Sequence, residues 1–347
     1  MTVDVRQIQL GNAVFEGNNN AYLLDGDVTT LIDVGIATTE TRAELEAELT
    51  TAGVSLSSID QILLTHWHAD HTGLAGEIQD VSGATVRAHA DDADLIATGK
   101  NSTKRREVRQ QRLEEWGVPA AKQDELLSFL DRFNGIGGES VDVDPVTDGQ
   151  KISAGDIELT VKHLPGHTAG HVGYHYSDKK ETFAFVGDVV LPEYTPNIGG
   201  ADLRVESPVS TYLNSLDRLS KMELEHVWPG HRERIINPAP RVDTICTHHV
   251  KRTRRLYDVL TEHGTTDVWN VSAALFGELD TIHILHGPGE AFAHLMCLVE
   301  SGIVERVEND TRVDPVRRGH SQQYRIINPE IASDIDIETI LLTSSPR

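Results

Sequence analysis

The sequence has little cysteine, no long apolar run and few cations, and each shortage excludes a class of protein. Only Cys246 and Cys297 occur in 347 residues, without the paired spacing of a disulfide framework or a structural zinc site, so we expect two buried thiols. No stretch approaches the roughly 18 apolar residues that a membrane helix needs. The amino terminus lacks the basic start and apolar run of a signal peptide. We therefore expect a globular, cytoplasmic protein with no membrane partner.

The shortage of lysine and arginine leaves the chain strongly acidic. Lys and Arg number 31 against 54 Asp and Glu, for a formal net charge of -23. Such a surface resembles that of haloarchaeal proteins, because it holds water and counter-ions in concentrated salt, whereas its own repulsion destabilises the compact state in dilute buffer. An ordinary acidic cytosolic protein is the alternative interpretation.

The length favours about two domains at roughly 150 residues each, and the apolar pattern of the first 240 residues predicts two β-rich halves. In the first half, alternating apolar residues predict strands that surround one helix at 39–52. Those strands are expected at 5–10, 21–24, 29–34, 62–64 and 85–88. In the second half, strands are expected at 157–161, 172–176 and 183–186.

Between the halves, residues 92–137 are charged and helix-forming, with helices expected at 105–116 and 124–133, and we interpret them as a helical insertion. Residues 1–240 are thus expected to form a catalytic domain. After it, three helices and a strand pair predict a winged helix over 241–327, followed by an acidic tail at 328–347. Those helices are expected at 242–262, 268–276 and 290–300, and the strands at 303–307 and 322–327.

Histidine and aspartate gather after the short strand at 62–64. The run His66-Trp67-His68-Ala69-Asp70-His71 places two imidazoles two residues apart and brings a carboxylate and a third imidazole into the next helical turn. Such a run is costly to bury unless a cation is coordinated. Further potential ligands end strands or follow sharp turns: Asp33, Pro165-Gly166-His167, Val186-Gly187-Asp188 and Pro229-Gly230-His231. A site assembled from several strand ends suits a sheet-based catalytic scaffold.

The run from Thr65 to His71, followed in order by the His167, Asp188 and His231 elements, resembles the signature of the metallo-β-lactamase superfamily over about residues 5–240. The resemblance implies an αββα sandwich with a metal site along one edge of two packed sheets. The expected fold class is therefore α+β: a metallo-β-lactamase sandwich with a helical insertion, plus a small carboxyl-terminal winged-helix domain.

The resemblance also implies two divalent metal ions. The resemblance implies seven ligands. One ion is held by His66, His68 and His167, and the other by Asp70, His71 and His231. Asp188 bridges the two ions. Zinc is the expected metal because its sites accept imidazole and carboxylate, and iron or manganese tolerates the same ligands.

Such a pair of ions predicts a hydrolytic mechanism. Two cations about 3.5 to 4 Å apart share one water and lower its pKa from about 15.7 toward 7, which gives a metal-bridging hydroxide as nucleophile. Asp70 beside it is the expected catalytic residue, because it orients the water and takes a proton. No Ser or Cys nucleophile is assigned.

Three functions are compatible with this site, because the scaffold alone does not select a substrate. The insertion, interpreted as a lid over a small-molecule cleft, favours an ester or thioester. The run from Pro165 to His171 is similar to that of hydroxyacylglutathione hydrolases, although their glutathione-binding segment is replaced here.

The second hypothesis is hydrolysis of single-stranded RNA, because a lactamase core with a winged helix is similar to a mitochondrial lactamase-like endoribonuclease. However, residues 287–302, where a recognition helix is expected, contain no Lys or Arg, so nucleic acid is not the favoured partner. A structural winged helix, or one that forms a homodimer, is the alternative. A non-catalytic metal-binding protein is the third hypothesis.

Several other residues have two interpretations. His89, His171 and Asp33 either support a ligand or are structural, and residues 191–200 either line the substrate cleft or form a rigid loop. Three side chains are expected to take no part in the site: His248 and His249 as solvated residues, and Trp67 in packing. Five arginines are expected to form either a basic patch or ion pairs: Arg252, Arg254, Arg255, Arg317 and Arg318.

The charge predicts that folding depends on salt. We expect the melting temperature to be higher in molar potassium chloride than in dilute buffer, because the screening length falls from about 30 Å at 0.01 M to about 3 Å at 1 M. A thermal unfolding series over potassium chloride concentration measures the effect. Coincident curves at low and high salt contradict the halophilic interpretation.

Overall fold

The computed structural model describes residues 3–11, 17–98, 103–133, 135–307, 321–327 and Ile337. The chain divides into two compact units. Unit 1 contains Met1–Ser102, Asn134–Pro196 and Ser215–Val242, and unit 2 contains Thr103–Phe133, Asn197–Asn214 and Asp243–Arg347. One boundary lies close to the expected position 240. However, unit 2 also includes most of the helical insertion and the segment Asn197–Asn214, both of which come before that position. The expected domain scheme stays a prediction, and its acidic tail, apart from Ile337, lies outside the described residues.

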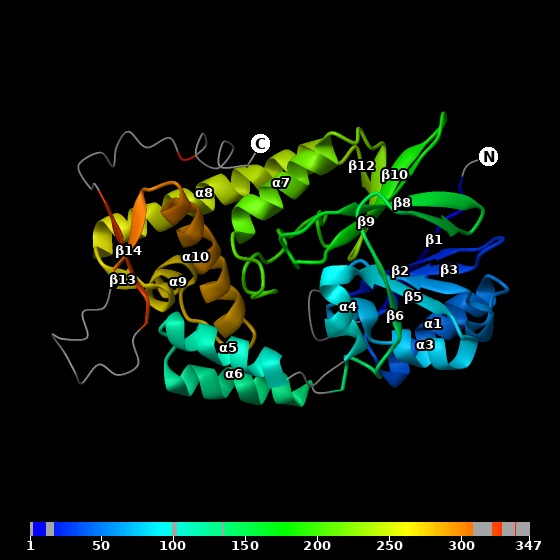
Figure 1. Ribbon diagram of the computed structural model, residues 1–347, viewed down its shortest axis with the longest axis horizontal. Helices are drawn as coiled ribbons and strands as arrows, with labels where there is room; N and C mark the ends of the chain where they lie inside the picture. Colours follow the sequence, from blue (N-terminus) through cyan, green and yellow to red (C-terminus); the bar gives the residue numbers. More distant parts are fainter. Residues whose placement is uncertain are drawn as a thin grey trace. The chain divides into compact units, whose positions relative to one another are not determined.

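The first sheet of unit 1 contains six strands in chain order (Figure 1). They are β1 (Arg6–Leu10), β2 (Asn19–Leu24), β3 (Thr30–Ile32), β4 (Gln61–Leu63), β5 (Thr85–His89) and β6 (Val143–Val146). The pairs from β1 to β3 are antiparallel, and those from β3 to β6 are parallel. Because parallel neighbours end at the same edge, the segments that follow β3 and β4 lie close together.

The second sheet of unit 1 has the order β12-β11-β10-β9-β8-β7. Its strands are β7 (Lys151–Ala154), β8 (Ile157–His163), β9 (Val172–Ser177), β10 (Thr182–Gly187), β11 (His226–Pro229) and β12 (Ile235–Ile236). β10 and β11 pair in parallel, and the other pairs are antiparallel. The segments after β10 and β11 therefore share an edge, as those after β3 and β4 do.

The two sheets of unit 1 pack face to face. One buried cluster joins Tyr22 and Leu24 of β2 to Val161 of β8 and Phe185 of β10. A second cluster lies on the other face of the first sheet, where Leu45 packs beside residues of the helical segments of the unit. Those segments are α1 (Thr39–Thr51), the 3-10 turn η1 (Leu56–Ser58), α2 (Ala69–Thr72), α3 (Ala75–Ser82) and α4 (Ala90–Ala97). The arrangement is a mixed α+β sandwich.

Unit 2 is helical, with one small sheet. It contains α5 (Thr103–Glu115), α6 (Ala120–Arg132), most of α8 (Ala239–His263), α9 (Val268–Phe276) and α10 (His283–Glu300), with β13 (Thr266–Asp267), β14 (Val304–Val307) and β15 (Gln323–Ile326) in the order β13-β15-β14. The insertion helices pack within this unit. The side chain of Trp116 is buried, and its ring centroid lies 5.6 Å from that of Phe292. The Trp116 carbonyl oxygen accepts the backbone N–H of Trp269 at 2.8 Å.

α10 begins earlier than the sequence predicts. We expected its start at residue 290, because Gly287-Pro288-Gly289 is typical of a turn, but the helix begins at His283. Glycine is required there by packing: a Cβ on Gly289 would lie 2.2 Å from Cα of Gly200. The elements without a sequence prediction include η1, β6, β11, β12, β13 and α7 (Pro208–Ser220). Of the two cysteines, Cys297 is buried and Cys246 is only partly buried.

The expectation that His249 is solvated is wrong. This side chain of α8 is fully buried, and its Nδ1 lies 3.3 Å from Nε2 of His294 in α10. Nδ1 of His294 lies 2.7 Å from Oγ1 of Thr253, whose hydroxyl donates to the His249 carbonyl oxygen. Nδ1 of His294 must therefore donate to Thr253. Burial lowers the pKa of both imidazoles, and in their neutral forms Nε2 of His294 accepts from Nδ1 of His249. His248 is partly exposed and lies 3.8 Å from Glu290.

The neutral pair predicts acid-dependent stability. Burial lowers the pKa of His249 from 6.5 to about 3, with Arg252 and His248 adding to the shift and Glu290 opposing it. The unfolded chain therefore binds more protons below pH 6.5, and the contribution is complete above that pH and lost as pH falls toward 3. His249→Gln removes this group, so we expect its unfolding free energy in urea to fall less steeply with acid, by up to about 1.4 kcal/mol per pH unit.

His283→Gln is the matched control, because His283 is an exposed histidine of the same unit. Its unfolding free energy is expected to have the wild-type slope against pH. A wild-type slope in the His249 variant as well contradicts the assignment of a buried neutral pair.

Candidate metal centre

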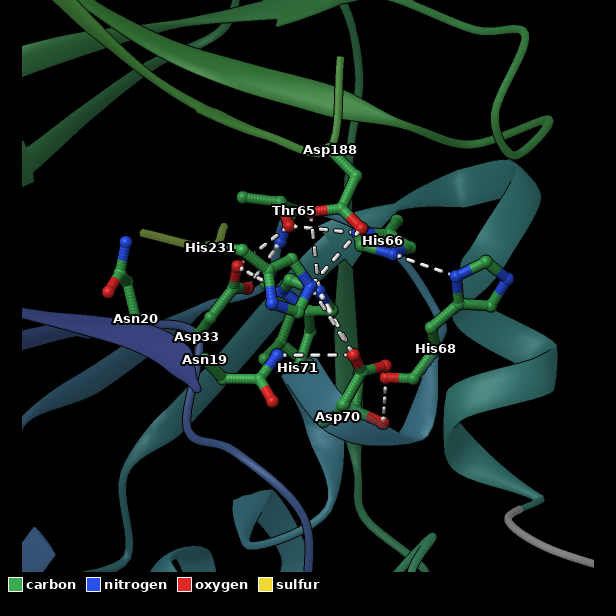
Figure 2. A network of polar contacts seen from close by, with 12 residues as sticks. Asn19, Asn20, Asp33, Thr65, His66, His68, Asp70, His71, Asp188 and His231 are labelled. Carbon is green, nitrogen blue, oxygen red and sulfur yellow. Dashed lines mark hydrogen bonds and ion pairs between the residues drawn. The ribbon is translucent and has the colours of Figure 1, made fainter. Parts of the chain in front are cut away.

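The seven side chains singled out in the sequence follow the ends of four strands. His66, His68, Asp70 and His71 come after β4, His167 after β8, Asp188 after β10 and His231 after β11. All come from unit 1, and the structure brings them together. Figure 2 shows Asp70, Asp188 and His231 gathered around His71, with His66 and His68 beside them. The strand ends predicted to meet therefore do so.

Three imidazoles form the first group. Nδ1 of His68 lies 3.0 Å from Nε2 of His66 and 3.1 Å from Nε2 of His167. One nitrogen from each ring lies within 4.8 Å of the other two. His66 is fully buried, and His68 occupies the N-cap position of α2 with an extended backbone, which turns its ring away from the helix. Three convergent imidazole nitrogens are a donor set that a divalent transition metal accepts.

The second group combines a carboxylate with two imidazoles. Oδ2 of Asp70 lies 3.5 Å from Nε2 of His231 and 3.8 Å from Nε2 of His71. Asp188 lies between the groups: its Oδ2 is 3.7 Å from Nε2 of His167 and 3.6 Å from Nε2 of His231, while its Oδ1 is 3.6 Å from Nε2 of His71. One carboxylate thus presents its two oxygens to both groups.

Two atoms at the centre lack hydrogen-bond partners. Nε2 of His71 and Oδ1 of Asp188 are buried and have no such partner among the residues that the structure describes. Buried polar atoms are rarely left so, because each unsatisfied atom costs about 1–3 kcal/mol. A cation between the imidazole nitrogen and the carboxylate oxygen satisfies both, so the residues present fit a divalent metal ion.

Asp33 fixes the orientation of one imidazole of the second group. Its Oδ2 accepts from Nδ1 of His71 at 2.8 Å and from the Thr65 hydroxyl at 2.8 Å, and its Oδ1 accepts the Thr65 backbone N–H at 2.8 Å. Because Nδ1 of His71 donates, Nε2 presents its lone pair toward the centre. Of the two interpretations of Asp33, the geometry favours support of a ligand.

His171 and His89 lie outside the seven-residue cluster. Nε2 of His171 accepts the backbone N–H of Asp188 at 3.1 Å, and its ring stacks on His66 at 4.8 Å, so it holds two ligand candidates in place. His89 instead caps α4, where its Nδ1 accepts the Asp91 N–H, and stacks on His163 at 4.0 Å. His171 thus supports the centre, whereas His89 is structural.

Carboxylates and imidazoles shift one another's pKa values in opposite directions. Burial opposes charge on His71 and His231, yet Asp188 and Asp70 raise the pKa of His71 well above its usual range and that of His231 to about 9. Burial would also raise the pKa of Asp188, but the charges of His231 and His71 lower it well below normal. Burial and neighbouring imidazoles lower the pKa of His66. Protons on two imidazoles therefore compensate the carboxylates when no other cation does.

Sequence reasoning missed three consecutive asparagines at the start of β2. The Asn18 carbonyl oxygen accepts from Nδ1 of His231 at 3.2 Å, and Nδ2 of Asn19 donates to Oδ2 of Asp70 at 3.1 Å (Figure 2). Asn20 donates to the carbonyl oxygens of Pro229 at 2.9 Å and Arg232 at 2.7 Å. The available signal was the polar run before an apolar strand, because Asn19 and Asn20 are buried and their amides need specific partners.

Asp92 is the second missed residue. It is fully buried, its Oδ2 accepts from Oγ1 of Thr168 at 2.9 Å and from the backbone N–H of Trp67 at 3.2 Å, and its Oδ1 accepts the Gly170 N–H at 3.0 Å. This carboxylate fastens the segment of His66 and His68 to that of His167. Trp67 also packs against the core of the first sheet, as expected.

Comparisons with known proteins agree on one family. The family described as "Metallo-beta-lactamase superfamily" matches residues 14–231. The Bacillus subtilis (strain 168) protein named "Probable metallo-hydrolase YqjP" is 28% identical over 319 residues, which cover 89% of this chain and 97% of that protein. "Acyl-coenzyme A thioesterase MBLAC2" of Gallus gallus is 29% identical over 181 residues, 48% of this chain and 54% of that protein.

A solved structure supports the same fold. A metallo-beta-lactamase family protein from Thermus thermophilus superposes with a TM-score of 0.77 at 25% identity and covers 93% of this chain and 98% of that chain. Among the described residues, no helix is long and apolar enough to cross a membrane.

The Asn19 contact predicts a change in metal affinity. Asn19→Ala removes the donor that holds Oδ2 of Asp70, so we expect the dissociation constant for added zinc to rise about tenfold, as is typical when a partner of a ligand is lost. Competition with a chromogenic chelator measures it.

Gln7→Ala is the control, because Gln7 donates to Oδ1 of Asn20 and to the Arg232 carbonyl oxygen without touching any of the seven side chains. Its zinc affinity is expected to match that of the wild type. Equal affinities in all three proteins contradict a role for Asn19 at the centre.

Proposed function

The chain belongs to the metallo-β-lactamase superfamily and is a hydrolase, and from this premise we propose that it hydrolyses a small thioester or ester with the help of two divalent metal ions. The observation that carries the proposal is the position of Asp188, whose two oxygens face both groups at 3.6 to 3.7 Å. A carboxylate so placed is suited to hold two cations at once.

In this proposal each ion has its own ligands and shares Asp188. The ligand sets are His66, His68 and His167 for one ion, and Asp70, His71 and His231 for the other. Zinc is the proposed metal because its sites accept imidazole nitrogen and carboxylate oxygen, and iron or manganese uses the same donors.

Two such ions supply Lewis acidity, which lowers the pKa of water and polarises an acyl oxygen. Asp70 is the proposed catalytic residue: it orients the attacking water and takes its proton, while Asn19 holds the carboxylate in place. The water oxygen adds to the acyl carbon, the carbon–sulfur or carbon–oxygen bond breaks, and the proton passes to the leaving thiolate or alkoxide.

A cysteine nucleophile is not supported. Burial raises the pKa of the Cys297 thiol to about 11, which leaves it protonated at neutral pH. Cys297 also belongs to unit 2, whereas the seven side chains belong to unit 1. Activated water is therefore the proposed nucleophile, and the name of the Gallus gallus relative supports a thioester as substrate.

We propose that residues 241–327 form a winged helix with a structural or dimerising role. The order α8-β13-α9-α10-β14-β15 supports that topology. The third helix, α10, is buried along most of its length and contains no Lys or Arg, which argues against an RNA contact.

Two arginines of this part make contacts within unit 2. Arg252 pairs with Glu290 at 2.5 Å, and Arg255 donates to the Leu275 carbonyl oxygen at 3.0 Å. Arg317 and Arg318 lie outside the described residues. RNA hydrolysis is therefore kept as an outcome of the test.

The bridging position of Asp188 predicts a joint loss of metal and turnover. We expect Asp188→Ala to bind fewer than two zinc ions per chain and to lose at least about a hundredfold in kcat/KM, because both ions share this ligand. Metal analysis by mass spectrometry and a panel of thioesters and lactones in concentrated potassium chloride measure the two effects.

Asp217→Ala is the control, because Asp217 is an exposed carboxylate paired with Lys221. Wild-type metal content and activity are expected. Full activity of Asp188→Ala refutes the assignment. Cleavage of labelled single-stranded RNA in place of the panel favours the nuclease, and bound metal without turnover on either substrate class favours a non-catalytic protein.

A further inference from the structure

The segment that follows Asp188 presents an exposed tyrosine from a fixed backbone. Tyr194 lies six residues after Asp188 and is 50% exposed, although large apolar rings are usually covered. Arg241 donates from Nε to the Leu191 carbonyl oxygen and from Nη2 to the Tyr194 carbonyl oxygen, both at 2.6 Å. These two bonds hold the backbone on both sides of Glu193, so the residue that carries the ring is fixed in place.

The guanidinium of Arg232 lies over that ring, with its carbon 4.7 Å from the ring centroid. The Arg232 backbone has a φ of 64°, in the left-handed region, and its carbonyl oxygen is held by the amides of Gln7 at 2.9 Å and Asn20 at 2.7 Å. A non-glycine residue persists in this conformation only where its surroundings enforce it, and such positions concentrate at functional sites and ligand clamps. The backbone of Arg232 is thus held in place, and its guanidinium lies over the ring of Tyr194.

The guanidinium has hydrogen-bonding capacity that the described protein leaves unused. Nε of Arg232 is buried without a hydrogen-bond partner in the described part of the chain. Nη1 pairs with Oε2 of Glu193 at 2.8 Å, but the two side chains are 35% and 62% exposed. An exposed pair of this kind is only weakly stabilising, so an oxyanion that hydrogen-bonds to the exposed part of the guanidinium can displace Glu193.

We propose that Arg232 and Tyr194 form an anion subsite beside the candidate metal centre and bind a phosphate or carboxylate group of the substrate. The placement follows from the chain: Arg232 is the residue after His231, and the Tyr194 segment follows Asp188. The inference rests on the proposed function and narrows its substrates to thioesters with an anionic group, either on the thiol carrier or on the acyl chain.

The overall charge favours a local cation for an anionic substrate. A chain with a formal charge of -23 repels anions at long range, so a nearby guanidinium strengthens the binding of an anionic thioester. Arg232 supplies this cation next to a ligand candidate, and Glu193 occupies it in the absence of substrate.

A comparison of three thioesters that share the pantetheine arm tests which anionic group of the substrate the subsite binds. Acetyl-pantetheine has no anionic group, acetyl-coenzyme A has phosphates on the carrier, and malonyl-pantetheine has a carboxylate on the acyl group. With Arg232→Ala we expect KM to rise about tenfold for the anionic thioester that the subsite binds, with kcat unchanged, because the contact is equally present in the ground and transition states. KM for acetyl-pantetheine is expected to stay at the wild-type value.

Arg6→Ala is the matched control, because Arg6 is 33% exposed and pairs with Glu48 at 3.2 Å, and its removal changes the net charge equally. Its KM values are expected to equal those of the wild type. Glu193→Gln tests the subsite from the other side: removal of the competing carboxylate is expected to lower KM for the same anionic thioester about threefold.

Equal KM changes for all three thioesters in the Arg232 variant, or no change in any, overturn the subsite. If the zinc-loaded wild type hydrolyses none of them, the proposed function fails separately, and equilibrium dialysis with coenzyme A and with malonate decides the subsite. Weaker binding of either probe by Arg232→Ala than by the wild type supports it, whereas equal binding of both overturns it.

Discussion

The burial of negative charge is the constraint on which the rest of the structure depends. Asp33, Asp70 and Asp188 are each less than one-tenth exposed, and a carboxylate without water needs positive charge or hydrogen-bond donors nearby. Imidazoles supply both: His71 and His231 have raised pKa values because these carboxylates favour their charged forms. A pair of divalent cations answers the same need more fully, which is why a metal centre suits this arrangement better than an ordinary core does.

The hydrogen bonds that close the sandwich also set the positions of the ligand candidates. The hydroxyl of Tyr174 in the second sheet donates to the Leu64 carbonyl oxygen after β4, and the Val172 N–H donates to the Thr65 carbonyl oxygen. Asn20 of the first sheet bonds to Gly230, where a Cβ would lie 2.3 Å from Oδ1 of Asp188. The site is therefore as rigid as the fold itself, which is the preorganisation that hydrolysis by activated water requires.

Most strands of the sandwich and the seven clustered side chains could be predicted from the sequence, because both depend on local patterns: alternating apolar residues and motifs at strand ends. The contacts of Asn19 and Asp92 could not, because their partners Asp70 and Thr168 lie 51 and 76 residues away. The early start of α10 was missed for a similar reason. Gly289 packs directly against the backbone of Gly200, which is far away along the chain, and does not form a turn. Contacts of this range have no signature within a local window of sequence.

The contact between Asn18 and His231 spans 213 residues and so orders events on the ribosome. At roughly 5–20 residues per second, the asparagines of β2 wait about ten to forty seconds for their partner to be synthesised. Four of the seven side chains, from His66 to His71, emerge long before Asp188 and His231. The nascent chain therefore carries four of the seven side chains long before the set is complete, which happens only after two-thirds of translation.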